Sequence, residues 1–304
     1  MINFKPISWE DKPLYEPYLH DGIERGCELS FANLYLWGYQ QAAIVQGHMV
    51  LFSQFGKRLV YPYPIGQGDK KPVLDAIMAD ARERGISCQI NSLYGDAVDT
   101  LERLYPGQFR IHCTRDAFDY VYDIHDLAEL AGRKYHRKRT HCNHFRAAYP
   151  DYRVAPISEE NVDDVRHMLD TWYEDRLSER PDSDYQMEQA AIYKALAHYK
   201  ELGMEGLALY NGAQILAMTL GSQASRDTFD VHFEKARWDV DGAYTVINNE
   251  FARYIRDKYP QIRFLNREED MGLEGLRKSK ESYYPHHMIE KCWAYPQEDT
   301  DDNR

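Results

Sequence analysis

Three ionisable residues recur at every second position along one predicted strand. Apolar and polar residues alternate strictly over residues 229–234, which indicates a β-strand with two different faces. The period of two puts Asp230, His232 and Glu234 on one face and three apolar residues on the other. Carboxylates and imidazoles can take a proton from an amine or hydroxyl, so Glu234 or His232 is the candidate general base. A half-exposed sheet without a chemical role is the alternative.

The predicted strand belongs to a strand–helix–strand unit. A helix is predicted over residues 242–258 and a second strand over residues 262–265, which ends in Asn266. A last helix then carries Arg277 and Lys280. Units of this length usually form parallel crossovers, and parallel sheets hold their ligands at the carboxyl ends of the strands. We therefore expect these polar side chains to gather at one edge of a sheet.

A basic run over residues 132–146 is the second feature with chemical potential. A single helix is predicted over residues 126–149, and Lys138 falls on its otherwise apolar side. One account is a solvated helix that balances an acidic protein. The other is a site for a phosphate-rich ligand, such as the pyrophosphate of CoA or the backbone of an RNA. The histidines of this run lack a suitably spaced carboxylate or Cys, so no metal site is predicted.

Composition limits the classes of partner. The 304 residues are enough for two domains, and the formal net charge of -12 argues against general attraction to nucleic acid or anionic membranes. An anionic ligand must therefore be held by a local basic patch. No apolar run approaches the ~20 residues of a membrane span, and the N-terminus lacks a signal-peptide pattern. We expect a cytoplasmic protein without an integral membrane segment.

The cysteine content supports the same compartment. The five cysteines are scattered and form no CxxC pair. Their odd number and their spacing predict reduced thiols rather than a disulfide framework or a zinc site.

Strand and helix signals recur on both sides of the basic helix. We predict an α/β domain over residues 1–125, the joining helix over 126–149, a second α/β domain over 150–295, and an acidic disordered tail over 296–304. The second half has the order strand, two helices, three antiparallel strands, helix, strand, helix, strand.

This order resembles the GNAT acyltransferase fold, and two such halves resemble the tandem arrangement of Fem-type aminoacyl transferases. The sequence is most similar to the C-terminal domain of phosphatidylglycerol lysyltransferases, in a soluble branch. The motifs that carry the resemblance are residues 132–139 with Asn143 and Phe145, residues 232–236, Gly242-Ala243, residues 275–280, and Tyr284-Pro285. The resemblance implies mixed α/β sheets in two tandem GNAT-like domains.

The resemblance also implies a reaction and a set of site residues. In the lysyltransferases this domain accepts aminoacyl-tRNA and moves the amino acid onto a lipid head group. The implied function here is aminoacyl transfer to an amine or hydroxyl acceptor. Catalysis in the lysyltransferases needs a polar pair on the central strand. His232, Glu234 and Lys235 lie in the matching stretch, with different residue identities, and are the expected catalytic residues. The expected substrate-binding residues are Lys138, Arg139, Asn143, Asn266, Arg277 and Lys280.

Two alternatives to aminoacyl transfer stay open. The first is an acyl-CoA-dependent N-acyltransferase, and the second is a non-catalytic module that binds an anion or RNA. Residues 236–242 stand where GNAT enzymes carry a Gly-rich phosphate loop, but hold one Gly and two Asp. Carboxylates at a helix start oppose phosphate, which favours an aminoacyl donor over acetyl-CoA. No cofactor beyond the donor is expected, and peripheral contact with lipid is compatible with the sequence.

Overall fold

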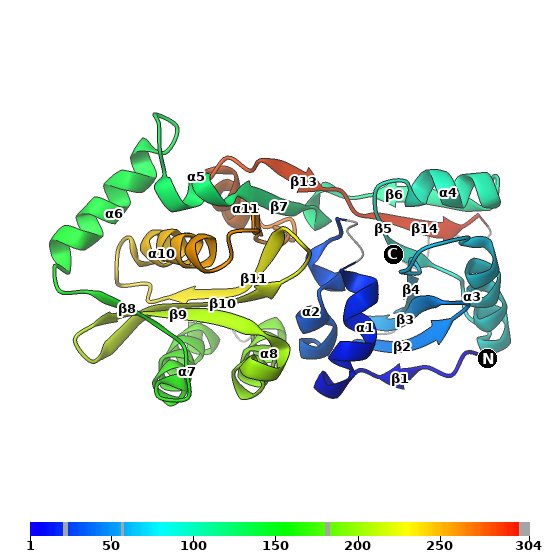
Figure 1. The fold of residues 1–304 in the computed structure, drawn as a ribbon, viewed down its shortest axis with the longest axis horizontal. Helices are drawn as coiled ribbons and strands as arrows, with labels where there is room; N and C mark the ends of the chain where they lie inside the picture. The colour runs from blue at the N-terminus through cyan, green and yellow to red at the C-terminus, as the bar shows by residue number, and fades with distance from the viewer. Residues whose placement is uncertain (21–23, 56–57, 180–182, 298–304) are drawn as a thin grey trace. The chain divides into compact units, whose positions relative to one another are not determined.

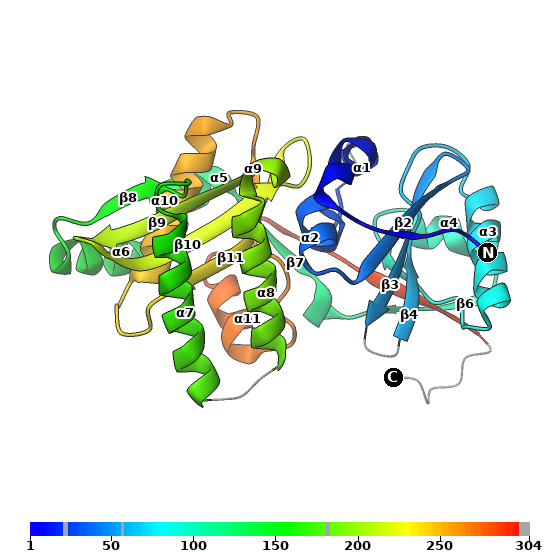
Figure 2. The same ribbon diagram turned by 90° about the horizontal axis from the view of Figure 1, so that it is seen from below.

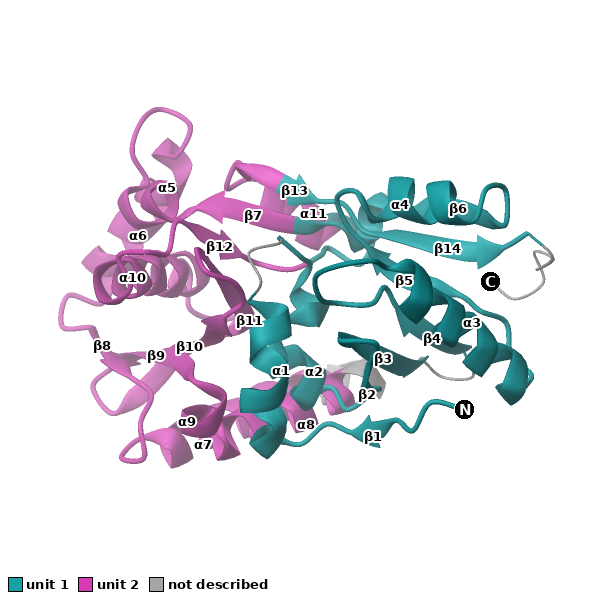
Figure 3. Ribbon diagram, turned by 45° about the vertical axis from the view of Figure 1, so that its right-hand side comes forward, with its two compact units in different colours: residues 1–119, 269–274, 288–304 teal, residues 120–268, 275–287 magenta. Residues whose placement is uncertain are grey.

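The chain forms two compact α/β units, each built on its own sheet. The computed structural model describes residues 1–20, 24–55, 58–179 and 183–297. Unit 1 comprises Met1–Asp119, Glu269–Glu274 and Met288–Arg304, and unit 2 comprises Tyr120–Glu268 and Gly275–His287 (Figure 3). The prediction of two α/β halves with separate sheets is confirmed. The two predicted domains follow one another along the chain. In the structure the chain returns twice to unit 1 after residue 268.

Unit 1 contains a mixed sheet with the strand order β1-β2-β3-β4-β5-β14-β6. The chain returns because the last strand inserts between two earlier ones and pairs antiparallel with both β5 and β6. The strands of this sheet are β1 (Lys5–Pro6), β2 (Gln40–Val45), β3 (His48–Phe55), β4 (Arg58–Pro62), β5 (Ile90–Leu93), β6 (Phe109–Cys113) and β14 (Cys292–Pro296).

The helices of unit 1 pack around this sheet. α3 buries Val73, Leu74 and Ile77 at helical spacing in the core of the unit, and ends at Gly85 in the left-handed conformation (φ 67°). The helices and 3-10 turns are η1 (Trp9–Asp11), α1 (Lys12–Leu19), η2 (Cys27–Leu29), α2 (Phe31–Leu36), α3 (Lys71–Arg84), α4 (Ala97–Leu104) and η3 (Arg115–Ala117).

Unit 2 contains the second sheet, with the strand order β13-β7-β12-β11-β10-β9-β8. β11 pairs parallel with β12 and antiparallel with β10, as the predicted crossover requires. The strands are β7 (Asp119–Asp123), β8 (Arg153–Pro156), β9 (Met204–Asn211), β10 (Gln214–Gln223), β11 (Thr228–Ala236), β12 (Phe264–Asn266) and β13 (His287–Ile289).

Helices cover both faces of the second sheet. α7 and α8 lie across one face, and α10 covers the other (Figures 1 and 2). α10 buries Val246, Ile247 and Phe251 against the sheet, as its sequence spacing predicts. The helices are α5 (Ile124–Glu129), α6 (His136–Ala148), α7 (Val162–Glu179), α8 (Ser183–Ala197), α9 (Tyr199–Leu202), α10 (Ala243–Lys258) and α11 (Glu274–Glu281).

A β-bulge in β11 changes the predicted faces of this strand. Phe233 pairs with Leu220 of β10, but the next pair is Val231 with Gly221, so His232 is an extra residue. Glu234 and Asp230 consequently point to opposite faces of the sheet. The prediction that Asp230, His232 and Glu234 share one face is wrong for Glu234. Gly221 permits the bulge, because a Cβ there would lie 2.3 Å from the carbonyl oxygen of Asp230.

The basic run lies on a shorter helix than predicted. Instead of one helix over residues 126–149, α5 ends at Glu129 and α6 begins at His136. Leu130 and Gly132 between them have φ values of 49° and 77°, which interrupt a right-handed helix. Arg139 donates hydrogen bonds to the carbonyl oxygens of Leu130 and Gly132, which satisfies the main chain of this turn.

Two cysteines are paired, contrary to the prediction of reduced thiols. Cys113 of β6 and Cys292 of β14 are direct partners in the strand register and form a disulfide, with Cα atoms 4.2 Å apart. Cys27, Cys88 and Cys142 lie outside this disulfide. The pairing depends on β14 returning beside β6 from 179 residues away, which local spacing does not reveal.

Two further predictions concern membranes and the C-terminus. None of the helices in the described ranges combines the length and the apolar composition needed to span a bilayer. The predicted disordered tail lies, from residue 298 onward, outside the described residues.

Candidate active site

A wide basic pocket opens along α6 in unit 2. It has a volume of about 1170 Å³ and is lined by Arg133, Lys134, His136, Arg137, Lys138, His141, Ser282 and Tyr284. Its cations come from the run singled out in the sequence, and Ser282 and Tyr284 follow α11. In a chain with a net charge of -12, this is a local concentration of positive charge suited to a polyanion.

Lys138 lies at the inner side of the basic pocket. Its ammonium group is 3.5 Å from the centroid of the Tyr283 ring, in a cation–π contact. Burial and the neighbouring Arg267 guanidinium lower the pKa of Lys138 to about 8. A substantial fraction of this side chain is therefore neutral near physiological pH, which is unusual for a lysine.

The Glu234 carboxylate forms an ion pair with Arg267, and the charges of both groups act on the pKa of Lys138. Its oxygens accept hydrogen bonds from Nη2 of Arg267 at 3.0 Å and from Nδ2 of Asn248 at 3.3 Å. The two charged side chains are only 11% and 14% exposed. Burial alone would lower the pKa of Arg267, but the Glu234 carboxylate and the Tyr122 and Tyr283 hydroxyls outweigh it and raise that pKa. We call Lys138, Glu234, Arg267, Asn248 and Tyr283 the Lys138 cluster.

His232 does not join the Lys138 cluster. It lies beyond the bulge, where Ser222 Oγ is 2.8 Å from its Nε2 atom. Asp230 and Glu268 lie on the side of its Nδ1 atom. No local pattern indicates a serine beside this histidine, because the contact arises from the pairing of Ser222 with Asp230 across two strands.

Lys235 also points away from the Lys138 cluster. Its ammonium group lies 2.7 Å from Glu188 of α8 and 4.4 Å from the centroid of the Trp172 ring of α7. These contacts place it on the face opposite Glu234, as the alternation of a strand requires. The structure therefore separates the three expected catalytic residues into three different surroundings.

The expected substrate-binding residues are divided in the same way. Lys138 alone among them lines the basic pocket, while Asn143 is exposed elsewhere on α6. Asn266 is buried and accepts a hydrogen bond from the Glu268 amide at 2.8 Å. Arg277 lies half-buried on α11.

Two of the expected phosphate contacts serve the main chain instead. Lys280 is buried, and its ammonium group donates to the carbonyl oxygens of Arg267 and Glu268 after β12. Arg139 closes the turn between α5 and α6, as described above. In these contacts both side chains stabilise the walls of the site rather than face a ligand.

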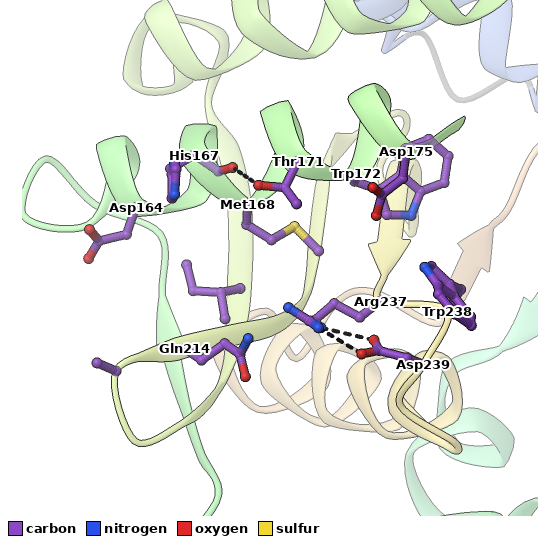
Figure 4. Close-up of a pocket in the computed structure, with 12 residues that line it drawn as sticks. Asp164, His167, Met168, Thr171, Trp172, Asp175, Gln214, Arg237, Trp238 and Asp239 are labelled. Carbon is purple, nitrogen blue, oxygen red and sulfur yellow. Dashed lines mark hydrogen bonds and ion pairs between the residues drawn. The ribbon is translucent and has the colours of Figure 1, made fainter. Parts of the chain in front are cut away.

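A second, smaller pocket lies on the α7 side of the sheet (Figure 4). It has a volume of about 290 Å³ and includes part of the 236–242 loop. Arg237 is held by the Asp239 carboxylate through bonds of 3.0 and 2.7 Å, and Asp164 and Asp175 also line the pocket. The one arginine is thus neutralised among carboxylates, which makes this loop a poor phosphate site.

Sequence reasoning missed three members of the Lys138 cluster. Arg267, Tyr283 and Asn248 come from different segments, and nothing in their local sequence marks them. The alternation around Glu234 and the basic run around Lys138 were the signals, and they identified two members of a cluster whose other members depend on tertiary packing.

Comparison with known sequences identifies the family. Residues 23–295 match the family described as phosphatidylglycerol lysyltransferase, C-terminal, so the chain belongs to this family. An uncharacterised protein from Mycoplasmoides gallisepticum is 25% identical over 175 residues, which cover 57% of this chain and 54% of that protein. The chain thus spans about half the length of this curated relative.

Solved structures confirm the predicted fold. A conserved protein of unknown function from Bacteroides thetaiotaomicron is 35% identical, with a TM-score of 0.93 over 98% of this chain and 100% of that chain. L-PGS from Bacillus licheniformis is 15% identical, with a TM-score of 0.71 over 99% and 95% of the two chains. FemX and a tandem GNAT protein from the clavulanic acid pathway share the fold at TM-scores of 0.60 and 0.53. The chain has the tandem GNAT-like fold of these transferases.

Proposed function

We propose that the protein transfers an aminoacyl group from aminoacyl-tRNA to an amine or hydroxyl acceptor. The observation that carries the proposal is the position of Lys138. This residue lines the basic pocket, and the charges of the buried Glu234–Arg267 pair act on its ammonium group, so it connects a surface for a polyanionic donor with a group that can move a proton.

The basic pocket supports a phosphate-bearing donor. Arg133, Lys134 and Arg137 stand on one wall with Lys138, and the backbone phosphates of a tRNA acceptor end require such a row of cations. Membership of the phosphatidylglycerol lysyltransferase family, whose name denotes transfer of a lysyl group, favours this donor over acyl-CoA. The carboxylates around Arg237 also favour aminoacyl-tRNA over acyl-CoA, because they oppose a phosphate at the 236–242 loop.

The Lys138 cluster supports acyl transfer by general base catalysis. The acceptor nitrogen or oxygen attacks the ester carbonyl carbon of the donor, and the bond from that carbon to the ribose oxygen breaks. The proton lost by the acceptor passes through the base to the leaving ribose oxygen. A base with a pKa near the operating pH is the most effective, which favours neutral Lys138 over the ion-paired Glu234. Arg267 is a fixed positive charge that can stabilise the oxyanion.

Donor binding is tested with charged tRNA, uncharged tRNA and acetyl-CoA over a range of salt concentrations. We expect binding of tRNA that weakens with salt, and a slope reduced by about one for each phosphate contact removed. Arg133→Gln/Arg137→Gln should lower the slope by about two, whereas Arg82→Gln/Arg166→Gln, with cations outside the pocket, should leave it unchanged. Binding of acetyl-CoA alone would favour the acyl-CoA alternative, and binding of neither would overturn the proposal.

The identity of the base is tested by the pH dependence of turnover. With Lys138 as base, turnover should rise with pH through about 8, and Lys138→Met should lose this limb. Glu234→Gln should keep the limb but move it to lower pH, because the Glu234 charge raises the pKa of Lys138. Loss of the limb in Glu234→Gln alone would instead assign the base to Glu234.

A further inference from the structure

We propose that Asp230, His232 and Glu268 bind one divalent transition-metal ion of the Zn²⁺ class. The site is separate from the Lys138 cluster, and the proposal does not depend on the reaction. One His and two carboxylates are a donor set suited to such an ion. One ligand atom from each of the three residues lies within 4.8 Å of the others.

The spacing of the ligand atoms fits a tetrahedral ion. Nδ1 of His232 is 3.5 Å from Oδ2 of Asp230 and 3.5 Å from Oε1 of Glu268. Two ligand atoms at about 2.1 Å from a tetrahedral ion lie about 3.4 Å apart. The two distances from the His232 Nδ1 atom therefore match the separations that a bound ion would impose.

Direct contact between the imidazole and the carboxylates accounts less well for these distances. Charge-assisted N–H···O bonds are usually about 2.7–2.9 Å long. The His232 side chain is completely buried, yet its Nδ1 atom has no hydrogen-bond partner among the residues that the structure describes. A buried ring nitrogen between two carboxylates, without a hydrogen bond to either, is the feature that points to a ligand.

Ser222 orients the ring from its other side. In the tautomer whose Nε2–H donates to Ser222 Oγ at 2.8 Å, the lone pair of Nδ1 faces Asp230 and Glu268. A cation bound by these three groups would make this tautomer favourable. Such outer partners of metal-bound histidines commonly fix the ring and its tautomer.

Local backbone geometry brings Asp230, His232 and Glu268 together. The bulge at His232 shifts the alternation of β11, and β12 runs parallel beside it with Asn266 opposite Asp230. Two residues later, Glu268 adopts φ 60°, an uncommon conformation that is held by the Asn266 side chain and by Lys280. The Glu268 side chain is 24% exposed, which gives an ion access from solvent.

A cluster in unit 1 has a similar set of possible metal ligands but contains a lysine. Cys27, Asp119 and Glu269 also place three ligand atoms within 4.8 Å. There the Lys291 ammonium group lies 2.6 Å from Asp119 and 3.3 Å from Glu269, so the chain itself supplies the central cation. This second cluster is consequently not proposed to bind metal.

Metal binding is tested on the full chain after dialysis against a chelator. Calorimetry with Zn²⁺ should show one tight site per chain, and Co²⁺ should give visible absorption bands of a site with a nitrogen ligand. Ser222→Ala should weaken zinc binding about 10–100-fold, and Glu268→Gln should weaken it more. His141→Gln removes an exposed histidine of the basic pocket and should bind zinc like the wild type.

Two results would overturn the proposal. The first is a chelator-treated wild-type protein that takes up no zinc and no cobalt. The second is an unchanged zinc affinity in both Glu268→Gln and Ser222→Ala, which would assign the observed binding to other residues. Because these two variants keep the buried His232 ring, the test does not depend on a His232 variant that can fail to fold.

Discussion

Lys291 of unit 1 and Lys138 of unit 2 both lie among charged groups, but their pKa values are shifted in opposite directions. In unit 1, the Lys291 ammonium lies 2.6 Å from Asp119, 2.8 Å from Glu28 and 3.3 Å from Glu269. Burial alone would lower the pKa of Lys291, but these carboxylates and Cys27 outweigh it and raise that pKa well above its ordinary value. In unit 2, burial and Arg267 lower the pKa of Lys138.

The difference in pKa distinguishes a lysine with a structural role, Lys291, from a lysine that can exchange a proton, Lys138. Lys291 is surrounded by anions and remains protonated. It therefore fixes the start of β14 to Glu28, Asp119 and Glu269, and it does not release its proton. Lys138 has a cation, an aromatic ring and a more distant carboxylate around it, and it lines an open pocket. Burial alone does not mark a functional lysine, and the sign of the surrounding charge decides its role.

The largest expected effect is on turnover at Lys138. Lys138→Met keeps the length and apolar contact of the side chain but removes the base, so the rate of transfer should fall about 10²–10⁴-fold. Stability should be unchanged or slightly higher, because a desolvated amine is lost. Lys134→Met, in the same pocket and paired with Asp126 at 2.8 Å, should affect donor binding and leave the rate at saturation nearly intact. Equal losses of rate in Lys138→Met and Lys134→Met would contradict a catalytic role that is specific to Lys138.

Lys291→Met should have the reverse profile, with a large loss of stability. It leaves Asp119, Glu28 and Glu269 without their central cation, and breaking buried ion pairs in this way costs about 3–5 kcal/mol. Urea unfolding measures the change, and Lys200→Met provides the control, because its pair with Glu159 is on the surface and should contribute nothing measurable. A Lys291→Met protein as stable as the Lys200→Met protein would contradict a structural role.

The disulfide should further stabilise the position of β14, the strand that directly follows Lys291. Cys292 directly follows Lys291, so the bond to Cys113 fixes β14 beside β6. Cys113→Ala/Cys292→Ala should lose about 2–5 kcal/mol, whereas Cys88→Ala should lose less. Thiol titration of the denatured protein should find three thiols before reduction and five after it. Five thiols without reductant would show that the bond does not form.

The smallest expected effect is a pH dependence of stability with opposite signs for the two lysines. Between the folded pKa of Lys138, about 8, and its ordinary value of 10.5, the unfolded chain binds more protons. Stability of the wild type should therefore rise with pH in this window relative to Lys138→Met. Lys291, with a raised pKa, contributes fully below 10.5 and loses its contribution above its folded pKa. Urea midpoints on both sides of the window from about 8 to 10.5 measure the slope that Lys138 causes, and equal slopes in wild type and Lys138→Met would contradict the shifted pKa.

Local sequence patterns determined the elements and the basic surface. The β-strand over residues 229–234 and the helix after Gly242 each depend on neighbours along the chain, and the structure has both. The cations of residues 133–138 lie on consecutive positions of one segment, so their joint exposure at a pocket followed from sequence proximity.

Tertiary structure alone decided which charged groups meet. One extra residue, His232, in the pairing with β10 moved Glu234 to the face opposite Asp230, and strand alternation cannot reveal a bulge that depends on a glycine in another strand. The partners of Glu234, Lys138 and Lys291 lie between about 14 and 264 residues away in the chain. A pKa depends on the field of all nearby charges and on burial, and both are fixed only when these distant segments pack together.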